Sequence, residues 1–408
     1  MRLAENHIIS KKHTLWQECD KICFASKNLY NQALYRVITH HKETKKYLSY
    51  NTLAREMAAE AQCDYVAMRA KVSQQTLMLL NRNMKSFFES LKKYKKNPSS
   101  FTGMPCLPRY LNKKKGRYEA VFTSQAVSRN GRLIRLSGTD IIIPTDKIVR
   151  QASVTPMENG DYKINIIYEF KEPYLIINDR YAGIDIGVNN LAAVVTNKEV
   201  TPFIINGRPL KAINQFYNKK LSKLKSELPF YVKENERVQR KSSKKIRRLT
   251  HKRNCKINDY LHKQSRKLAD KLKQADISKV VIGQNKKWKT NVNIGSKNNQ
   301  KFVLIPHAKF IQMCNYKLRL VGTKTILREE SHTSKCSFLD HEEIKHHERY
   351  AGRRIRRGLF KTSTGFLWNA DCNGAANILV KEIPNAFADG IEAVVVPPIR
   401  IKSYTKVA

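Results

Sequence analysis

Three acidic residues stand at the ends of apolar, strand-like segments in a very basic chain. Asp185 lies in YAGIDIGVNNLAAVVTN, Glu330 ends the segment KTILREE, and Asp371 lies in WNADCNGAANILV. Mg²⁺ prefers carboxylate oxygens, and two divalent ions held about 3.5–4 Å apart can hydrolyse a phosphodiester. We therefore expect these three carboxylates to form the site of a metal-dependent nuclease.

Asp185 is the strongest member of the set when each is taken alone. Strand alternation places Ile184 and Ile186 on the face opposite Asp185, so a surface position explains this residue poorly. Gly183 and Gly187 allow backbone or substrate to come close. The alternative is a carboxylate that caps a turn at the end of the strand.

The other acidic residues have ordinary explanations when they are considered one by one. Asp371 heads an apparent helix and could be its N-cap. Glu329 and Glu330 end a strand and could lie in a solvated turn. Only the combination of the three positions favours a metal site.

The composition of the chain indicates a polyanionic partner. The 408 residues include 77 Lys and Arg against 34 acidic residues, a net charge of +43, while 41% of residues are hydrophobic. Charge of this size repels itself in a compact state unless a polyanion binds, and the apolar fraction suffices for packed cores. The length allows two or three domains. A general RNA-binding protein is the simplest alternative.

Localisation follows from what the sequence lacks. It has no apolar run of about 20 residues, and its N-terminus has no apolar signal core. The eight cysteines include no CxxC pair. We therefore expect an intracellular protein in a reducing compartment, with no membrane partner: nucleoid-associated in the cytoplasm of a bacterium, or nuclear in a eukaryotic or viral system.

The elements that must position the carboxylates follow from periodicity. Residues 1–14 are strand-like, 15–95 are helical, and 117–175 form hairpins that turn at Asn130–Gly131 and Asn159–Gly160. After residue 181 the predicted order is two strands, a helical stretch over 211–274, the strand ISKVVIGQN, a helix over 302–320, the strand of Glu330, a charged insert over 331–365 and a helix over 371–382. This order predicts an α/β layer.

The helical stretch contains a dense run of basic residues beside an apolar stripe. Almost no acidic residues interrupt the run, so i,i+4 ion pairs do not explain it. A solvated helix face is the alternative to a surface that binds nucleic acid, which we favour. The candidate residues are Lys244, Lys245, Arg247, Arg248, Lys252, Arg253 and Lys256.

Taken together, these motifs resemble the TnpB family of RNA-guided DNA endonucleases from insertion sequences, which are related to Fanzor proteins and type V CRISPR effectors. The resemblance rests on GIDIGVNNLAAV, VVIGQN, EESHTSK and NADCNGAANIL, on the linker NPSSFTGMPCLPRY and on the basic helix. It implies an α/β and α+β multidomain fold. A β-barrel-like wedge would span 1–14 and 105–178, a helical recognition domain 15–104, and an RNase H-like RuvC domain 179–330 and 366–385, followed by a tail over 386–408.

By this resemblance Asp185, Glu330 and Asp371 are the catalytic, metal-binding residues, and they would hold two Mg²⁺ ions, or Mn²⁺. Most TnpB proteins carry the middle Glu at the end of the strand VVIGQN, where this chain has Gly283. Some relatives carry it three residues before the Thr of TSK, which is Glu330 here. Neighbouring strands lie about 4.8 Å apart, so a carboxylate from the next strand can reach the same ion. Glu329 is the fallback.

The insert over 331–365 departs from the family pattern. The family usually carries a four-cysteine zinc finger here, whereas Cys336 stands alone and the spacing of His341, His346, His347 and Cys372 fits no common finger. We expect a basic loop without zinc. Its candidate nucleic-acid contacts are Arg353, Arg354, Arg356 and Arg357.

The resemblance implies a monomer that binds one guide RNA from its own element and a double-stranded DNA target, and that also contacts the non-target single strand. Base pairing would supply the sequence specificity, and the protein would recognise a short target-adjacent motif. The rival function is an RNA-guided DNA-binding repressor that does not cleave.

Overall fold

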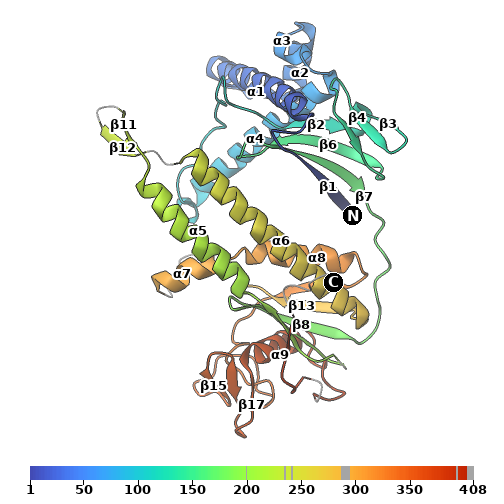
Figure 1. Cartoon of the computed structure of the whole chain (residues 1–408), viewed down its shortest axis with the longest axis vertical. Coiled ribbons are helices and arrows are strands. Elements are labelled where there is room, and N and C mark those ends of the chain that lie inside the picture. Colours follow the sequence, from blue (N-terminus) through green and yellow to red (C-terminus); the bar gives the residue numbers. More distant parts are fainter. Residues whose placement is uncertain (199, 234–235, 240–241, 286–294, 392–393, 402–408) are drawn as a thin grey trace. The chain divides into compact units, whose positions relative to one another are not determined.

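The computed structural model describes residues 1–198, 200–233, 236–239, 242–285, 295–391 and 394–401. The chain divides into two compact units, Met1–Lys171 and Glu172–Ala408 (Figure 1). The mixed α/β, multidomain class predicted from the sequence is confirmed. Each unit has its own hydrophobic core.

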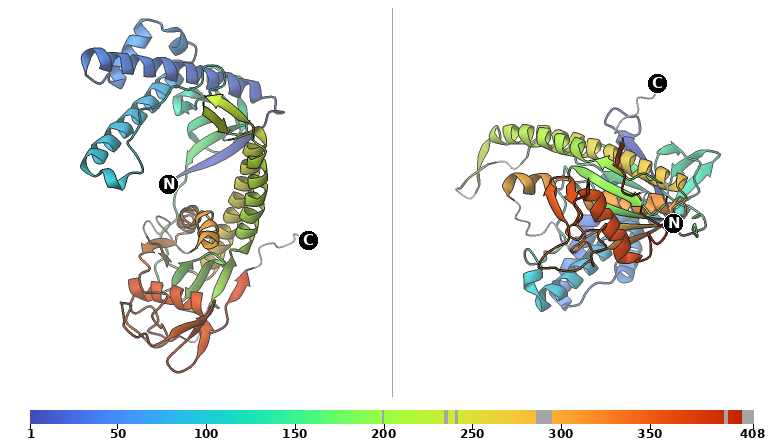
Figure 2. Two further views of the ribbon diagram at one scale, coloured as in Figure 1. Left: turned by 90° about the vertical axis from the view of Figure 1, so that its left-hand side faces the viewer. Right: turned by 90° about the horizontal axis from the view of Figure 1, so that it is seen from below.

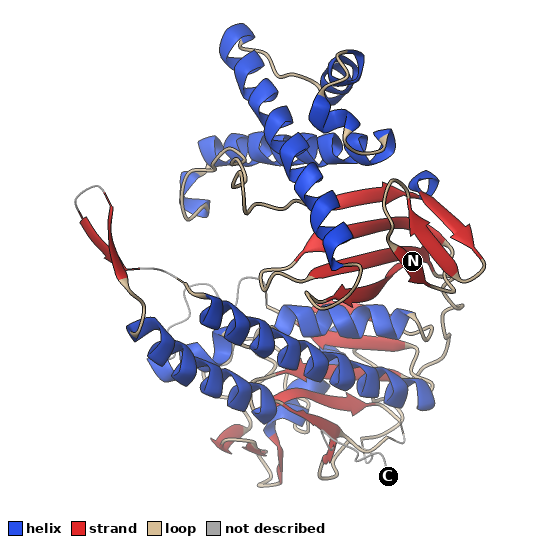
Figure 3. Ribbon diagram, turned by 45° about the horizontal axis from the view of Figure 1, so that its top comes forward, coloured by secondary structure: helices blue, strands red, loops and turns tan. Residues whose placement is uncertain are grey.

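The first unit packs helices against antiparallel strands, as predicted (Figure 3). Its helices are α1 (Trp16–Thr44), α2 (Tyr50–Ala59), α3 (Cys63–Val66) and α4 (Ala70–Lys96). Strands β1 (Arg2–Ile9), β7 (Tyr162–Glu169), β6 (Val149–Pro156) and β2 (Ala120–Thr123) form one sheet in that order, and β3 (Val127–Asn130), β4 (Leu133–Leu136) and β5 (Ile142–Pro144) form another. Gly131 and Gly160 adopt positive φ angles at the two predicted turns.

The predicted strand over YEAVFTSQAVS is divided between these two sheets. A short 3-10 turn, Ser124–Ala126, separates β2 from β3 and buries Ala126. A second such turn, Pro98–Ser100, follows α4 where the sequence changes to the linker.

The second unit is built on a six-stranded sheet of order β14-β13-β8-β9-β10-β18. The strands are β8 (Tyr181–Ile186), β9 (Asn190–Thr196), β10 (Phe203–Asn206), β13 (Lys279–Gly283), β14 (Lys324–Arg328) and β18 (Ile399–Ile401). Strand β9 is antiparallel to both of its neighbours, whereas β8, β13 and β14 run parallel. The parallel strands therefore end at one edge of the sheet, where Asp185 and Glu330 lie.

Helices cover both faces of this sheet (Figure 2). Helices α5 (Arg208–Ser226), α6 (Lys244–Gln274), α7 (Ser296–Val303), α8 (His307–Arg319) and α9 (Ala370–Glu382) belong to this unit. Ile184 packs with Leu268 and Phe310 on one face, and Val281 packs with Ile378 of α9 on the other. Burial on both faces explains why the central strands β8, β9 and β13 are largely apolar.

Two predicted helices in this unit need correction. The stretch over 211–274 is not one helix, because α5 and α6 are separated by a hairpin of β11 (Phe230–Lys233) and β12 (Glu236–Gln239). Pro229 follows the end of α5 and cannot donate the backbone hydrogen bond that would continue the helix. Pro306 likewise divides the predicted helix over 302–320 into α7 and α8.

The insert and the C-terminal segment also contain more regular structure than predicted. Within the insert and just after it, β15 (Arg353–Arg356), β16 (Leu359–Lys361) and β17 (Leu367–Asn369) form an antiparallel sheet. Phe360 and Trp368 pair across it and are buried, which supplies the small core that a plain loop would lack. In the tail, β18 extends the six-stranded sheet beside β10.

Candidate active site

Asp185 points from β8 toward helix α9. Strand β8 pairs Asp185 with Ala193, and its neighbours Ile184 and Ile186 face the opposite core. A Cβ atom added at Gly374 of α9 would lie 3.1 Å from Asp185 Oδ2. The absence of a side chain at Gly374 therefore leaves room for the Asp185 carboxylate beneath the helix.

Glu330 occupies the space above Gly283. A Cβ atom added at Gly283 would collide with Glu330 Oε1 and lie 2.6 Å from Glu330 Cγ. Asn285 holds this arrangement, because its side chain accepts from the Glu330 backbone N–H at 2.9 Å and donates to Glu330 Oε2 at 3.3 Å. The empty position on β13 is thus filled by a carboxylate that follows β14.

The second carboxylate oxygen of Glu330, Oε1, differs from Oε2. Glu330 Oε1 is buried and has no hydrogen-bond partner among the described residues. A buried carboxylate oxygen without a partner costs free energy unless a proton or a cation meets it.

Glu329, the fallback residue, diverges from the site. Its side chain is 59% exposed and pairs with Lys381 at 3.3 Å. It also accepts a hydrogen bond from the Ser331 hydroxyl, and this bond and the bond from Lys381 lower the pKa of Glu329. Of the two adjacent glutamates, only Glu330 approaches Asp185.

Asp371 is not the N-cap of α9. The cap is Asn369, whose side chain accepts from the backbone N–H groups of Asp371 and Cys372. The Asp371 carboxylate instead accepts from Asn190 Nδ2 at 2.6 Å and from Arg354 Nη2 at 2.9 Å. It lies in the first turn of the helix, where the helix dipole stabilises negative charge.

Electrostatics tie the three acidic residues together. Burial raises the pKa of Asp185 well above its usual range, and the nearby charges of Glu330 and Asp371 raise it further, against the opposing effect of Arg354. Burial, and to a lesser degree Glu329, raises the pKa of Glu330 from 4.5 to about 7. Carboxylates held this close repel one another, and a cation among them would relieve the repulsion.

Asp185 and Asp371 open into a pocket of about 670 Å³. Its other walls include Gly187, Asn190 and Ser334. Four arginines also line it, namely Arg208, Arg354, Arg357 and Arg400. A site that joins acidic oxygens to guanidinium groups fits a phosphodiester better than a small neutral ligand.

Buried asparagines fix the elements that carry the acids. Asn373 donates to the Cys336 carbonyl at 2.8 Å, and Asn377 donates to the carbonyls of Thr333 and Cys336. The Thr333 hydroxyl in turn donates to the Glu330 carbonyl at 2.9 Å. These bonds attach the segment after Glu330 to α9, and so fix the position of Glu330 relative to that helix.

Sequence reasoning missed several residues of this site. Asn369, Asn373 and Asn377 recur every four residues in an otherwise apolar helix, which is a signal that could have been used. Arg208 and Arg400 gave no such signal, because they come from a helix start and a distant edge strand.

Within the described part of the chain, no three His, Cys, Asp or Glu side chains converge closely enough to hold a metal ion. Arg354 meets Asp371 instead. Asp371 is therefore paired with a guanidinium group, and the three carboxylates do not form a closed metal site among the described residues.

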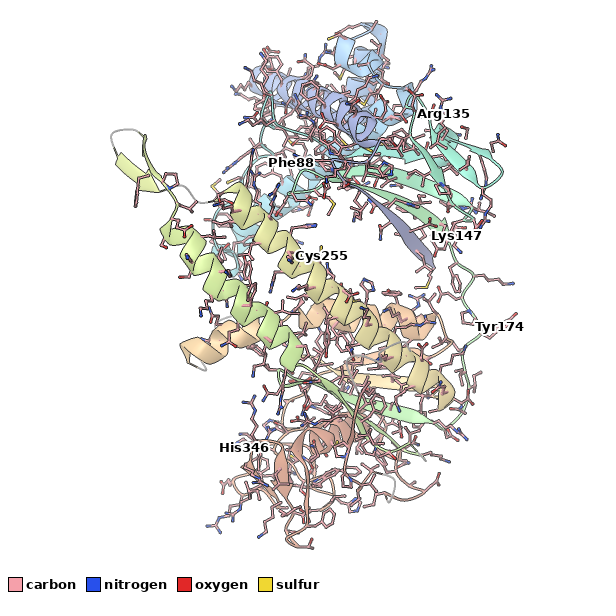
Figure 4. The ribbon with its side chains drawn as sticks, in the orientation of Figure 1. Phe88, Arg135, Lys147, Tyr174, Cys255 and His346 are labelled. Carbon is pink, nitrogen blue, oxygen red and sulfur yellow. The ribbon has the colours of Figure 1, made fainter. Side chains whose placement is uncertain are left out.

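The predicted basic surface on α6 is largely exposed. Cys255 lies on the exposed side of this helix (Figure 4). Arg253 differs from its neighbours, because its guanidinium donates to Asn214 Oδ1 and to the Leu304 carbonyl, and burial lowers its pKa. The exposed members of the predicted set are Lys244, Lys245, Arg247, Arg248, Lys252 and Lys256.

Of the four candidate arginines in the insert, two line the carboxylate pocket and two do not. Arg353 and Arg356 lie on the exposed strand β15, whereas Arg354 and Arg357 reach the carboxylate pocket. Cys336 is buried, and its thiol donates to the carbonyls of Glu343 and Lys345. None of the helices in the described residues is long and apolar enough to cross a membrane.

Two family models match segments that contain these residues. The model OrfB_IS605, described as a probable transposase, matches residues 166–289, which include Asp185 and Gly283. The model of the Cas12f1-like TNB domain matches residues 307–378, which include Glu330 and Asp371. The resemblance to TnpB is confirmed. The two matched segments together contain Asp185, Glu330 and Asp371, whereas Arg400 of the pocket lies outside both.

Solved structures similar to this TnpB-like chain include two Cas12f complexes and one Cas-phi endonuclease. The Cas12f1–sgRNA–target DNA complex is 14% identical over 94% of this chain and 100% of that chain, with a TM-score of 0.37. The CRISPR–Cas12f ternary complex is 13% identical over 90% and 80%, with a TM-score of 0.36. The mini-RNA-guided endonuclease CRISPR–Cas_phi3 is 8% identical over 97% and 92%, with a TM-score of 0.44. No curated protein sequence matches the chain.

Proposed function

We propose that this chain is an RNA-guided, Mg²⁺-dependent DNA endonuclease of the TnpB type. The observation that carries the proposal is that Glu330 and Asp371, from two other elements, lie close enough to Asp185 to raise its pKa, while Glu330 Oε1 is buried without a partner among the described residues. Carboxylates with pKa values raised by burial and by one another are concentrated at functional sites.

The strand order supports an RNase H-like, RuvC-type core. The first three strands of the sheet form an antiparallel meander, and two further parallel strands, β13 and β14, lie on the other side of β8. In this reading Asp185 lies on the central strand and Asp371 begins the helix that covers it. The antiparallel sheets of the first unit would be the wedge domain, and α1–α4 the recognition helices.

The residues present fit a divalent cation. Asp185, Glu330 and Asp371 would hold it, because hard cations take carboxylate oxygens and Glu330 Oε1 is buried without a partner among the described residues. When bound, Mg²⁺ supplies Lewis acidity that lowers the pKa of a water molecule and neutralises charge on the leaving oxygen.

The remaining residues act on the substrate and on the acids. Arg208, Arg357 and Arg400 neutralise the phosphates that enter the pocket. Asn190 orients Asp371 through its hydrogen bond. Arg354, which is 45% exposed, donates to Asp371, and it would be available to bind phosphate if a cation were held by Asp371.

The proposed partners follow from charge and from the TnpB resemblance. An excess of 43 positive charges favours a polyanion, and the exposed cations of α6 would contact phosphates of the guide RNA and the target. The guide would supply specificity by base pairing.

A second candidate function is guided DNA binding without cleavage. The observation that favours it is the Arg354–Asp371 ion pair, which occupies one of the three acids. If this pair persisted with DNA bound, the site would remain without metal.

The test begins with sequencing of the RNA that co-purifies with the chain. Its guide portion is then redirected to a plasmid that carries a randomised flanking sequence, and cleavage is measured with Mg²⁺. We expect Asp185→Asn to reduce cleavage at least about a thousandfold while RNA and DNA binding persist, because catalytic residues of a concerted site contribute on this scale. Glu329→Gln is the matched control and should cleave normally.

The outcomes separate the two candidates. Cleavage by the wild type and its loss in Asp185→Asn support the endonuclease. If the wild type and Asp185→Asn bind the guided target equally and neither cuts, the chain is the DNA-binding protein. Co-purification of RNA with no preferred species would exclude both guided functions.

A further inference from the structure

A second pocket lies between α5 and α6, which run side by side in Figures 1 and 2. Its volume is about 470 Å³. Ile213, Phe216 and Leu249 form its apolar wall, and Lys220, Lys252 and Lys256 form its rim. The carboxylate site does not include any of these residues.

Phe216 is the feature that a packing role does not explain. Its side chain is 60% exposed on α5, and the Lys220 ammonium lies 6.0 Å from the centre of its ring. Tyr217 beside it is shielded by Arg253, 5.5 Å from its ring. Phe216 therefore offers an open aromatic surface in a pocket surrounded by positive charge.

This combination fits an unpaired nucleobase with its phosphates. Aromatic rings stack on bases of any sequence, while lysines at the rim bind the flanking phosphates. An apolar protein segment would fit the wall, but it would leave the three rim lysines without opposite charge.

The position of the pocket along α5 identifies which strand would supply the base. Arg208 lines the carboxylate pocket, and Ala212 and Phe216 follow it at steps of four residues along one stripe of α5. Eight residues of helix span about 12 Å, which is a few nucleotides of a single strand. A DNA strand that enters the carboxylate pocket would pass this site.

We propose that the pocket between α5 and α6 binds one unpaired base of the DNA strand that is cut, stacked on Phe216 and held by Lys220, Lys252 and Lys256. The identity of this strand rests on the proposed nuclease function. The pocket would fix the position of the scissile phosphate relative to Asp185.

The test uses the full chain in EDTA and fluorescence anisotropy with a labelled 12-nucleotide oligothymidylate. Phe216→Ala should weaken binding roughly 5- to 100-fold, the range found when base–aromatic stacking is removed. An abasic oligonucleotide of equal length should bind wild type and variant alike, because it has phosphates without bases. Phe216→Leu, which keeps the apolar volume but removes the ring, should behave like Phe216→Ala.

Tyr174→Ala is the matched control. Tyr174 is 96% exposed on the segment after β7 (Figure 4), so it tests whether any exposed aromatic residue affects binding. Tyr174→Ala should leave the affinity for oligothymidylate and the affinity for the abasic oligonucleotide unchanged. In an oligothymidylate that carries one 2-aminopurine, stacking on Phe216 should quench the fluorescence of that base. The quenching should be weaker with Phe216→Leu than with the wild type.

Equal oligothymidylate affinity in the wild type and both Phe216 variants would overturn the proposal. So would an effect of Phe216 confined to an oligouridylate RNA, which would assign the pocket to the guide. Cleavage by the same preparations is measured separately with Mg²⁺. A Phe216-dependent affinity without cleavage would reject the nuclease and keep the base pocket, whereas cleavage without that dependence would reject the pocket alone.

Discussion

Two partly buried acidic clusters, one in each unit, satisfy their carboxylates in opposite ways. In the first unit Asp20 accepts from Arg117 Nε and Nη2 at 2.9 and 2.7 Å and from the Tyr162 hydroxyl at 2.6 Å. Burial raises its pKa, but the hydrogen bonds from Arg117 and Tyr162 outweigh burial, so the pKa of Asp20 is lowered. In the second unit Glu330 keeps one oxygen unpartnered, and its pKa is raised.

The difference separates acids that hold the fold from acids that await a ligand. The Asp20 cluster joins α1 to β7 and to the segment before β2. The Arg117 guanidinium and the Tyr162 hydroxyl supply the hydrogen bonds to its carboxylate. The Glu330 cluster contains like charges, and among the described residues Arg354, Asn190 and Asn285 donate hydrogen bonds to its carboxylates. Such a cluster lowers stability unless something else binds.

The sharpest test of this comparison is the pH dependence of stability in metal-free buffer. A raised pKa in the folded state means that the native protein binds more protons, so stability falls as pH rises from about 4.5 to about 7. The shift for Glu330 corresponds to at most about 3 kcal/mol. Glu330→Gln should remove this loss in peptides of the second unit, measured by hydrogen exchange with mass spectrometry.

Asp185 and Asp371 lie near Glu330, so part of the slope belongs to Asp185, whose pKa is also raised. Millimolar Mg²⁺ should flatten the slope in the wild type and do so less in Glu330→Gln. An identical slope in both proteins, with and without Mg²⁺, would show that Glu330 is not a buried, unsatisfied acid.

Gly283→Ala should reduce guided cleavage about a hundredfold. The added Cβ would occupy the volume of the Glu330 carboxylate, and displacement of a positioned group by about 1 Å can cost this much. The rate of plasmid cleavage measures the effect. Gly103→Ala is the control, because a Cβ at Gly103 meets no atom within 4 Å. Cleavage at the wild-type rate in Gly283→Ala would mean that Glu330 takes no part.

Asp20→Asn should destabilise the first unit by about 2 kcal/mol, because it removes a charged acceptor of three hydrogen bonds. Exchange protection of peptides in α1 and β7 measures the loss. Cleavage by the folded fraction should not change. Here the sign of the pH effect is reversed: the wild-type contribution is present above about pH 4 and is lost as pH falls.

Glu329→Gln should have the smallest effect, under about 0.5 kcal/mol, because its ion pair with Lys381 is exposed. Thermal unfolding and cleavage should match the wild type. A loss of cleavage as large as that of Glu330→Gln would erase the distinction between the two adjacent glutamates.

The elements and the identity of the three acids could be predicted from sequence, whereas their mutual geometry could not. Periodicity located β8, β13, β14 and α9, and the signal was plainest for β8 and β13, which are mostly buried. It failed at Pro229 and Pro306, where basic and apolar periodicity continued across residues that end a helix.

The partners of the acids depend on tertiary contacts. Asn369 takes the capping role that Asp371 could have had, and no pattern distinguishes these two residues of the same turn. The contact of Arg354 with Asp371 depends on how β15 folds back on α9. Arg400 reaches the pocket because β18 pairs with β10 across about 200 residues of chain.

The collision between Gly283 and Glu330 also limits how sequences of this kind can change. A glutamate at position 283 and one at position 330 compete for a single volume, so a chain cannot gain the first while it keeps the second. Passage from one arrangement to the other must cross an intermediate that has either a clash or no middle carboxylate. The double substitution Gly283→Glu with Glu330→Gly would move the middle carboxylate to position 283 without a clash. Gly283→Glu alone would create the clash, and Glu330→Gly alone would remove the middle carboxylate. The space beside β13 therefore admits the carboxylate of only one of these two positions at a time.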